Sequence, residues 1–466
     1  MTPSTHILDH LSDRSRKRLI LAACILGSTI VFVDSTVVNV ALPAIRRDLG
    51  GGLVLQEWVV DAYLLTLGSL ILVGGSLADL FGEKRIFSIG VATFGIASLF
   101  CALAPDGTVL ILARGLQGIT GALLTPAALA TITSVFSGEE RGAAIGTWTA
   151  WTGIAFVIGP LVGGWLVSAA SWRSIFFINP PLVLATLALI QVSMPGRDRG
   201  EARARVDVVG GVLCMLGLAG PVFALIELPK RGFSDPLILA TLFGGIALLV
   251  AFVAWERRTA SPMLPLRLFR RRNFTWANVE TLTVYAALST LTFFLVLFLQ
   301  QLAGYSPFRS GLATVPITVV MFFLSPRVGR LSMRLGPRFF MGIGPFVCAG
   351  GIVWIGRLKP GFDYWTELLP PLLLFAAGLS LIVAPLTSTV LADAGERDAG
   401  IASGVNNAVA RVAGLLGIAI VGAAIAGSAN RLDLSGYRLS MAITAVLIAV
   451  GGVIGLAGIR NRAAGS

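Results

Sequence analysis

The sequence has little charge for its length. Of its 466 residues only 13% are Asp, Glu, Lys or Arg, whereas about a quarter are charged in a typical soluble domain. Hydrophobic residues make up 55% of the chain and the mean hydropathy is +0.84. This shortage excludes an ordinary soluble protein and predicts a membrane protein.

The sequence also lacks the residues of a metal or disulfide framework. The four cysteines lie in separate apolar segments without a CxxC pair, and the two histidines lie in the polar N-terminal tail: Cys24, Cys101, Cys214, Cys348, His6 and His10. Scattered apolar cysteines are typical of buried small side chains. We therefore expect neither a metal site nor a cofactor, and no His-based nucleophile inside the body of the protein.

Long apolar runs dominate what is present. A helix needs about 20 residues to cross a bilayer, and fourteen stretches are long enough: 19–41, 58–77, 86–104, 109–131, 143–168, 174–193, 206–227, 236–255, 275–299, 311–329, 339–357, 366–391, 399–426 and 438–458. The runs are continuous instead of alternating, which indicates helices and not the strands of a barrel. The expected fold class is an all-α membrane protein.

The basic residues predict the orientation of these helices. With the N-terminus in the cytoplasm, the inward segments hold 24 of the 36 Lys and Arg residues and the outward loops hold 10. The remaining two, Arg114 and Arg411, lie within apolar stretches. This bias is typical of membrane topology, and it places both termini in the cytoplasm. The net charge of +12 therefore does not indicate nucleic-acid binding.

An internal repeat divides the chain. "GSLADLFGEKR" at 75–85 resembles "GRLSMRLGPRF" at 329–339, and "EERGAAIG" at 139–146 resembles "GERDAGIA" at 395–402. Both pairs relate one helix to the helix eight positions later, which predicts two homologous six-helix bundles around an inserted pair, a pattern typical of transporters. The expected parts are an N-terminal tail (1–18), a first bundle (19–193), two inserted helices (194–255), a linker (256–274), a second bundle (275–458) and a C-terminal tail (459–466).

Ionisable residues inside the first bundle are the main functional candidates. Asp34, Asp61 and Arg114 fall at a similar depth on three different helices, and buried carboxylates in membrane helices are costly and usually functional. We expect Asp34 to carry a proton, Asp61 to be a second acid, and Arg114 to be the fixed charge that couples them. Glu57, one turn before Asp61, is expected at a wet rim, and the second bundle offers no matching acid beyond Glu280. The alternative is that Asp34 only hydrogen-bonds a neighbouring helix.

Four motifs resemble those of the fourteen-helix drug:proton antiporters of the major facilitator superfamily. They are "DSTVVNVALPAI" (34–45), "GSLADLFGEKR" (75–85), "ILARGLQGITGA" (111–122) and "IGPLVGG" (158–164). The resemblance covers essentially the whole chain and implies the major-facilitator fold. It also implies proton-coupled efflux of amphipathic small molecules or drugs by alternating access, and so multidrug or antibiotic resistance. The implied setting is a bacterial plasma membrane, with a monomer powered by the proton motive force.

The resemblance assigns roles to two of these motifs. The stretch "IGPLVGG" is the antiporter motif of this family, with Gly159, Pro160, Gly163 and Gly164. It is expected to form a seal between the two bundles that prevents leakage, or else to be only a kink that allows close packing. The segment 75–85 is expected to be a cytoplasmic gating loop that acts through Gly75, Asp79, Gly82, Lys84 and Arg85. The alternative is that its charges only set the membrane topology.

A substrate cavity between the bundles is expected to be lined by the first, second, fourth and fifth helices of each. Polar and aromatic residues on these helices are the candidates: Asn39, Gln117, Trp148, Trp151, Asn406, Asn407 and Arg411. The tryptophans could equally face lipid or the core, and the asparagines could join helices. Arg411 could pair with a phospholipid, an anionic substrate or an acid, so neutral or singly charged amphipathic compounds are favoured over dications.

Two other functions remain open. A proton-coupled uptake symporter could use the same fold, although the "IGPLVGG" stretch argues against it. A membrane-embedded lipid-modifying enzyme would need clustered acids, histidines or metal ligands at a membrane face, and the loops are short and lack them. We therefore expect a transporter and not an enzyme.

Overall fold

The computed structural model describes residues 12–194, 206–394, 398–425 and 432–461. Within these ranges all regular structure is helical, and fourteen helices are long and apolar enough to cross a membrane. Most of the N-terminal tail, the last five residues and the start of the repeat segment 395–402 lie outside the described residues.

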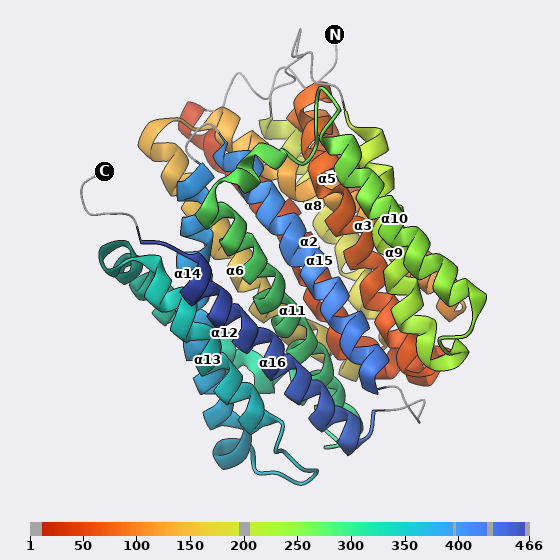
Figure 1. Cartoon of the computed structure of the whole chain (residues 1–466). Coiled ribbons are helices and arrows are strands. Elements are labelled where there is room, and N and C mark those ends of the chain that lie inside the picture. The colour runs from red at the N-terminus through yellow and green to blue at the C-terminus, as the bar shows by residue number, and fades with distance from the viewer. Residues whose placement is uncertain (1–11, 195–205, 395–397, 426–431, 462–466) are drawn as a thin grey trace.

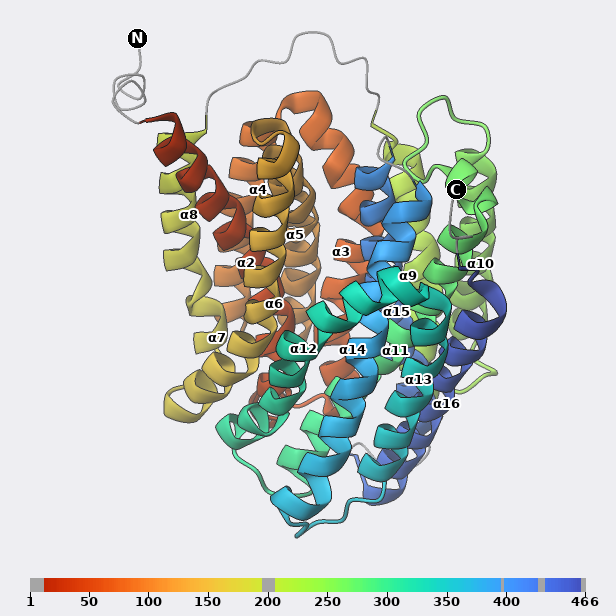
Figure 2. The same cartoon turned by 90° about the vertical axis from the view of Figure 1, so that its left-hand side faces the viewer.

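The helices form two sets of six, and the pair that comes between them in the chain lies at one side of the molecule (Figures 1 and 2). The first set comprises α2 (Asp13–Leu49), α3 (Gly52–Phe81), α4 (Glu83–Ala102), α5 (Gly107–Val135), α6 (Gly138–Ala169) and the broken helix α7 (Ser174–Phe177) with α8 (Asn179–Ser193). The pair is α9 (Val208–Arg231) and α10 (Pro236–Glu256). After the short helix η1 (Leu266–Arg270), the second set comprises α11 (Arg272–Gln301), α12 (Pro307–Leu335), α13 (Pro337–Ile355), η2 (Tyr364–Leu368) with α14 (Leu369–Ala394), α15 (Ala399–Ile425) and α16 (Leu434–Gly458).

Helix packing repeats between the two sets. In the first, α3 and α4 pack on α5, while α2 packs on α6 and α8. In the second, α12 and α13 pack on α14, while α11 packs on α15 and α16. Each pair in one set thus has its counterpart eight helices later. This confirms the predicted fold class of two pseudo-symmetric six-helix bundles with two inserted helices.

Most helices extend beyond the predicted apolar stretches, because a helix continues into the polar region where hydropathy no longer detects it. The segment 75–85 shows the largest consequence. It is not a loop, since α3 continues to Phe81 and α4 begins at Glu83. Only Gly82 separates them, at φ 88°, a conformation that glycine adopts without the steric clash of a Cβ atom. The prediction of a loop here was wrong.

The bundles meet along two edges, α3 against α15 and α6 against α12. The inserted helix α9 contacts both α3 and α15, and α10 packs on α9. We call the end of the molecule with residues 13–18, 82–85 and 257–272 the basic end, and the end with residues 49–52, 170–174 and 302–306 the far end.

The bundles are in close contact at the far end. Gly164 of α6 packs on the backbone of α12, where an added Cβ would lie 2.6 Å from the carbonyl oxygen of Pro307. Gln300 Nε2 of α11 donates a hydrogen bond of 2.9 Å to the carbonyl of Val40 on α2. Toward the basic end, α6 loses such neighbours, since a Cβ on Gly146 or Gly153 would meet no atom within 4 Å. The far end is therefore the closed one along this edge.

Candidate functional site

A buried ion pair joins α2 to α5. Arg114 Nη1 lies 2.5 Å from Asp34 Oδ2, and the two side chains are 1% and 0% exposed. Removing either partner would leave the other charge without compensation in a medium of low dielectric constant, which is strongly unfavourable. The pair is therefore a fixed part of this arrangement of the bundles.

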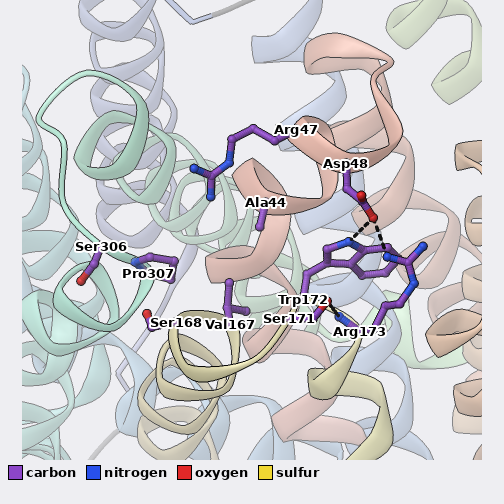
Figure 3. A pocket seen from close by; sticks show the side chains of 10 residues that line it. All are labelled: Ala44, Arg47, Asp48, Val167, Ser168, Ser171, Trp172, Arg173, Ser306 and Pro307. Atoms are coloured by element: carbon purple, nitrogen blue, oxygen red, sulfur yellow. Dashed lines mark hydrogen bonds and ion pairs between the residues drawn. The ribbon is translucent and has the colours of Figure 1, made fainter.

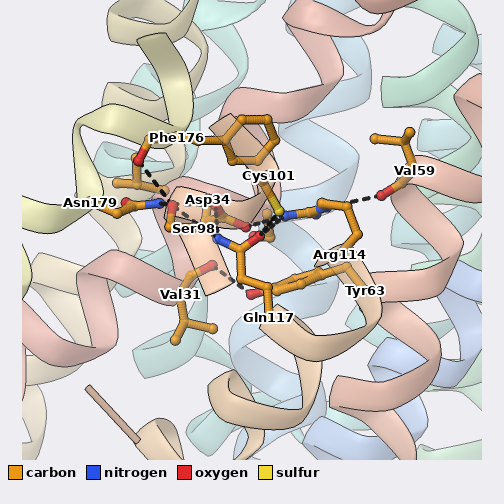
Figure 4. Close-up of polar contacts among 12 residues, drawn as sticks. Val31, Asp34, Val59, Tyr63, Ser98, Cys101, Arg114, Gln117, Phe176 and Asn179 are labelled. Carbon is orange, nitrogen blue, oxygen red and sulfur yellow. Dashed lines mark hydrogen bonds and ion pairs between the residues drawn. The ribbon is translucent and has the colours of Figure 1, made fainter. Parts of the chain in front are cut away.

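Three further polar side chains complete the surroundings of Asp34 (Figure 4). Gln117 Nε2 donates to Asp34 Oδ1 at 2.8 Å, and Asn179 Nδ2 of α8 donates to the same oxygen at 3.2 Å. Asn179 also donates to Ser98 Oγ of α4 at 2.8 Å. Arg114 Nη1 donates to Gln117 Oε1 at 2.7 Å, which closes the network. The carboxylate accepts three hydrogen bonds, two from α5 and one from α8.

The guanidinium of Arg114 is held from the side of α3 as well. Its Nε donates to the carbonyl of Val59 at 3.0 Å, and its central carbon lies 4.2 Å from the centre of the Tyr63 ring. The Tyr63 hydroxyl in turn donates to the carbonyl of Val31 on α2 at 3.2 Å. Cation–π contact stabilises a desolvated arginine, so five helices converge on this network, which we call the Asp34 cluster: Asp34, Tyr63, Ser98, Arg114, Gln117 and Asn179.

The other acids of α3 lie apart from this cluster. Asp61 is fully buried, and neither of its carboxyl oxygens has a hydrogen-bond partner in the described part of the chain. Glu57 is 2% exposed, so the expectation of a wet rim was wrong, and its carboxyl contacts Gly422 of α15. On the same face of α3, Gly68 contacts Arg411. Asp61 and Glu57 therefore lie on the face of α3 that packs against the second bundle, whereas the ion-pair partner of Arg114 in the described structure is Asp34.

Among the described residues of the second bundle, Glu280 is the acid comparable to Asp61. Glu280 of α11 is fully buried, and both of its carboxyl oxygens lack a partner among the described residues. Nearby, Asn406 of α15 donates to Asn278 Oδ1 at 3.2 Å and to Thr281 Oγ1 at 2.8 Å on α11. The Asn406 amide thus joins two helices of one bundle.

The remaining residues expected to line a substrate cavity differ in their surroundings: some form hydrogen bonds within the protein and others are exposed. Trp148 Nε1 donates to Ser28 Oγ of α2 at 2.9 Å, whereas Trp151 is 51% exposed. Asn407 donates to the carbonyl of Ser403 in its own helix. Asn39 is partly buried on α2.

Arg411 is also partly buried, and its guanidinium carbon lies 5.3 Å from the centre of the Phe32 ring of α2. It therefore faces the opposite bundle.

The glycines of "IGPLVGG" contact two different helices. Gly159 packs on Thr36, and Gly163 packs on Val37, both on α2 within the same bundle. Gly164 and the carbonyl of Pro160 face α12 in the other bundle, the latter against Gly311. A side chain on any of these glycines would separate the helices, so this segment of α6 sets the spacing on both sides.

The segment 75–85 lies at the basic end. Lys84 Nζ donates to the carbonyl of Met194 at the end of α8, at 2.6 Å. Asp79 and Arg85 are exposed, and Gly75 lies against Pro126 of α5. This segment therefore ties α3 and α4 to other helices of the first bundle.

A surface pocket of about 480 Å³ opens at the far end (Figure 3). It lies between the ends of α2 and α6 and the start of α12, and Asp48 accepts hydrogen bonds there from Trp172 Nε1 at 2.9 Å and from Arg173 Nη1 at 2.5 Å. Asp48 is fourteen residues from Asp34 along α2, about 21 Å at 1.5 Å per residue. The pocket is therefore separate from the Asp34 cluster.

The sequence did not identify three members of the Asp34 cluster: Tyr63, Ser98 and Asn179. Asn179 offered a usable signal, because an amide inside an apolar stretch needs a hydrogen-bond partner. Gln117 was assigned to the substrate cavity, but its amide bonds Arg114 and Asp34. Ser98 and Tyr63 are common enough in membrane helices that no local pattern distinguishes them.

Comparison with known proteins gives consistent matches. The profile of the Major Facilitator Superfamily matches residues 24–418. The puromycin resistance protein of Streptomyces alboniger is 37% identical over 88% of this chain and 82% of its own length. The cephamycin export protein of Amycolatopsis lactamdurans is 35% identical over 86% and 83%. The methylenomycin A resistance protein of Bacillus subtilis is 33% identical over 91% and 90%.

Solved structures share the fold at low sequence identity. A peptide transporter crystallised with sulfate superposes with a TM-score of 0.70 at 14% identity, over 98% of both chains. A bacterial homologue of the human lysosomal transporter Spinster, in an inward-facing and unoccupied conformation, gives a TM-score of 0.66 at 20% identity over 95% and 96%. These similarities concern the arrangement of helices.

Proposed function

Because the chain belongs to the major facilitator superfamily, we propose that it exports amphipathic small molecules, antibiotics among them, in exchange for protons. The relatives named for antibiotic resistance or export support this class of substrate. The observation that carries proton coupling is the Asp34 cluster, in which a sealed carboxylate is matched by an arginine and two amides.

The cluster provides a way to couple protonation to helix position. In the present arrangement three N–H groups donate to the two oxygens of Asp34, so most of the lone-pair positions of this carboxylate are occupied. A proton bound to Asp34 Oδ2 would repel the N–H that Arg114 Nη1 donates to this oxygen. It would also neutralise the negative charge of the ion pair. Arg114 retains Gln117 and Val59 as acceptors, so it can move with α5 and α3 while α2 separates from it. Proton uptake then favours a different packing of the first bundle.

Asp61 and Glu57 supply a second step at the interface between the bundles. Separating α3 from α15 would expose both carboxyls to water, and closing the helices would dehydrate them. Burying an unpaired charge is far more costly than burying a neutral acid. Closure of the far end is therefore coupled to proton uptake by these acids, which adds a proton site on the side opposite to Asp34.

The orientation follows from the basic end. We place this end and both termini in the cytoplasm of a bacterial cell, by the distribution of Lys and Arg. The tight contacts at the far end then correspond to a state closed to the outside, in which the bundles 19–193 and 275–458 have rocked apart on the cytoplasmic side. The partners in this proposal are protons, the exported compound and membrane lipid, without a cofactor, and the protein acts as a monomer.

The test is transport in everted membrane vesicles with an acidic lumen, using puromycin as the first compound. An antiporter accumulates puromycin in the lumen and releases protons from it, and an electroneutral exchange gives about tenfold accumulation per pH unit. The variant Asp34→Asn abolishes this accumulation, while Asp48→Asn at the far end retains it. An uptake symporter gives proton movement of the opposite sign. Gradient-driven accumulation by Asp34→Asn at the rate of the unmodified protein would overturn the proposal.

A further inference from the structure

Arg411 occupies an unusual position between the bundles. It lies near the middle of α15, twelve residues after the helix begins, and it projects against α2 and α3 of the other bundle. Its guanidinium lies over the ring of Phe32, and its Cβ would be 3.0 Å from a Cβ placed on Gly68. The residue is only partly buried, so part of it remains accessible to a ligand.

This guanidinium has no hydrogen-bond acceptor and no ion-pair partner in the described part of the chain. The ionisable side chains in electrostatic range of Arg411 are two tyrosines, Tyr63 and Tyr285. A guanidinium carries five N–H donors, and leaving them unmatched at membrane depth is costly. An acceptor that is absent from the protein itself would compensate for this.

Among the described residues the buried acids do not supply that acceptor, and Glu280 of α11 has no hydrogen-bond partner either. Asp34 already accepts three hydrogen bonds within its own cluster. Asp61 is seven residues from Gly68 on α3, about 10 Å farther toward the far end, and Glu57 is one turn beyond it. The position opposite Arg411 is thus left to a ligand.

We propose that Arg411 binds the anionic group, a carboxylate, of the exported compound. This assignment rests on the proposed export function and adds organic acids with an apolar body to its substrates. Arginine matches a carboxylate with two parallel hydrogen bonds. The rings of Phe32 and Tyr285, on α2 and α11, are both partly exposed and provide a surface for the apolar part of the same molecule.

The proposal has a consequence for energetics. Exporting a monoanion while one proton enters moves two positive charges inward in net terms, so the membrane potential drives the exchange together with the pH gradient. A neutral analogue moves only one. The carboxylate form of a compound is therefore exported with a steeper dependence on potential than its neutral analogue.

The experiment measures binding by the purified full chain in phosphatidylcholine nanodiscs. The probes are 1-pyrenebutyrate and 1-pyrenebutanol, which share one ring system and differ in charge. We expect the carboxylate to bind about tenfold more tightly than the alcohol, as for a hydrogen bond between charged groups. Arg411→Gln removes this preference and changes alcohol binding by less than twofold. Arg411→Lys retains a reduced preference, and the exposed control Arg309→Gln retains all of it.

Several outcomes would overturn the proposal. They are equal or tighter binding of the alcohol by the unmodified protein, an equal loss of both probes in Arg411→Gln, and displacement of the carboxylate by phosphatidylglycerol through Arg411, which would assign the site to lipid. The ratio in the unmodified protein decides even if a variant fails to fold. A preference for the carboxylate probe without proton-driven transport of any compound would overturn the export function alone. Puromycin antiport without a preference for the carboxylate probe would overturn the Arg411 site alone.

Discussion

The two bundles share one packing scheme and differ in what fills it. In the first bundle α2, α5 and α8 enclose a charged network around Asp34 and Arg114. In the second, the equivalent helices α11 and α16 enclose stacked rings, with the centres of Phe298 and Tyr437 4.1 Å apart. The Tyr437 hydroxyl donates to a backbone carbonyl, as Tyr63 does in the first bundle. One packing scheme thus supports a charged network in the first bundle and a stack of aromatic rings in the second.

This difference indicates a division of labour. The hydrogen bonds of a buried charged network depend on whether its carboxylate carries a proton, whereas packed aromatic rings contain no carboxylate. We therefore expect the first bundle to respond to protons and the second, despite its buried acid Glu280, to serve as the more rigid counterpart. Four changes would break or sharpen this contrast.

The largest effect is expected at Arg114. Arg114→Gln leaves Asp34 without its counter-charge and destabilises the protein by about 3–5 kcal/mol. The double variant Asp34→Asn with Arg114→Gln regains most of that stability, because no unpaired charge remains, but it does not regain proton-coupled transport. Thermal unfolding in detergent and vesicle transport measure the two properties. Phe298→Leu in the second bundle is the comparison, and loss of proton coupling in Phe298→Leu would end the contrast.

The next effect separates two buried acids. Asp61→Asn removes no hydrogen bond from the described structure, so stability changes by less than about 1 kcal/mol, while the pH dependence of transport is flattened and its rate falls severalfold. Glu280→Gln, an equally buried and unpartnered acid in the second bundle, leaves the pH profile unchanged. Rates measured between pH 5.5 and 8.5 distinguish them. A flattened profile in Glu280→Gln would show that both bundles bind coupling protons.

A smaller effect is expected where the bundles touch. Gly164→Ala places a methyl group against the backbone of α12, which disfavours the closed far end and slows transport about threefold to fivefold, as a cost near 1 kcal/mol implies. Spin-label distances across the far end should lengthen. The matched control is Gly153→Ala on the same helix, where the added methyl meets open space. Equal distances in both variants would argue against the contact.

The smallest effect is expected in the second bundle at Asn406. Asn406→Ala removes two hydrogen bonds between α15 and α11 and destabilises the protein by about 1 kcal/mol, since such contacts in membranes are weak. Transport stays within twofold of the unmodified rate, and its pH dependence is unaltered. A change in substrate preference would instead place Asn406 in the cavity.

Much of the fold could be predicted because hydropathy and charge bias act on every helix. The break between α3 and α4 was placed wrongly, because the end of α3 is amphipathic and its low hydropathy was taken to indicate a loop. In the structure only Gly82 separates the two helices. Within the site, the ion pair of Asp34 and Arg114 is consistent with the similar membrane depth expected for both residues, because opposite charges at one depth attract each other. Which face of α3 carries Asp61 could not be predicted, because it depends on the packing of α15 and not on any local pattern.

The contact of α9 with both α3 and α15 has a mechanical meaning. Three helices pack together along that edge, whereas only two, α6 and α12, meet along the other. The bundles are therefore expected to separate more easily between α6 and α12. Bulky molecules are then expected to pass on the side of α6 and α12, while α3, α9 and α15 keep the two bundles aligned.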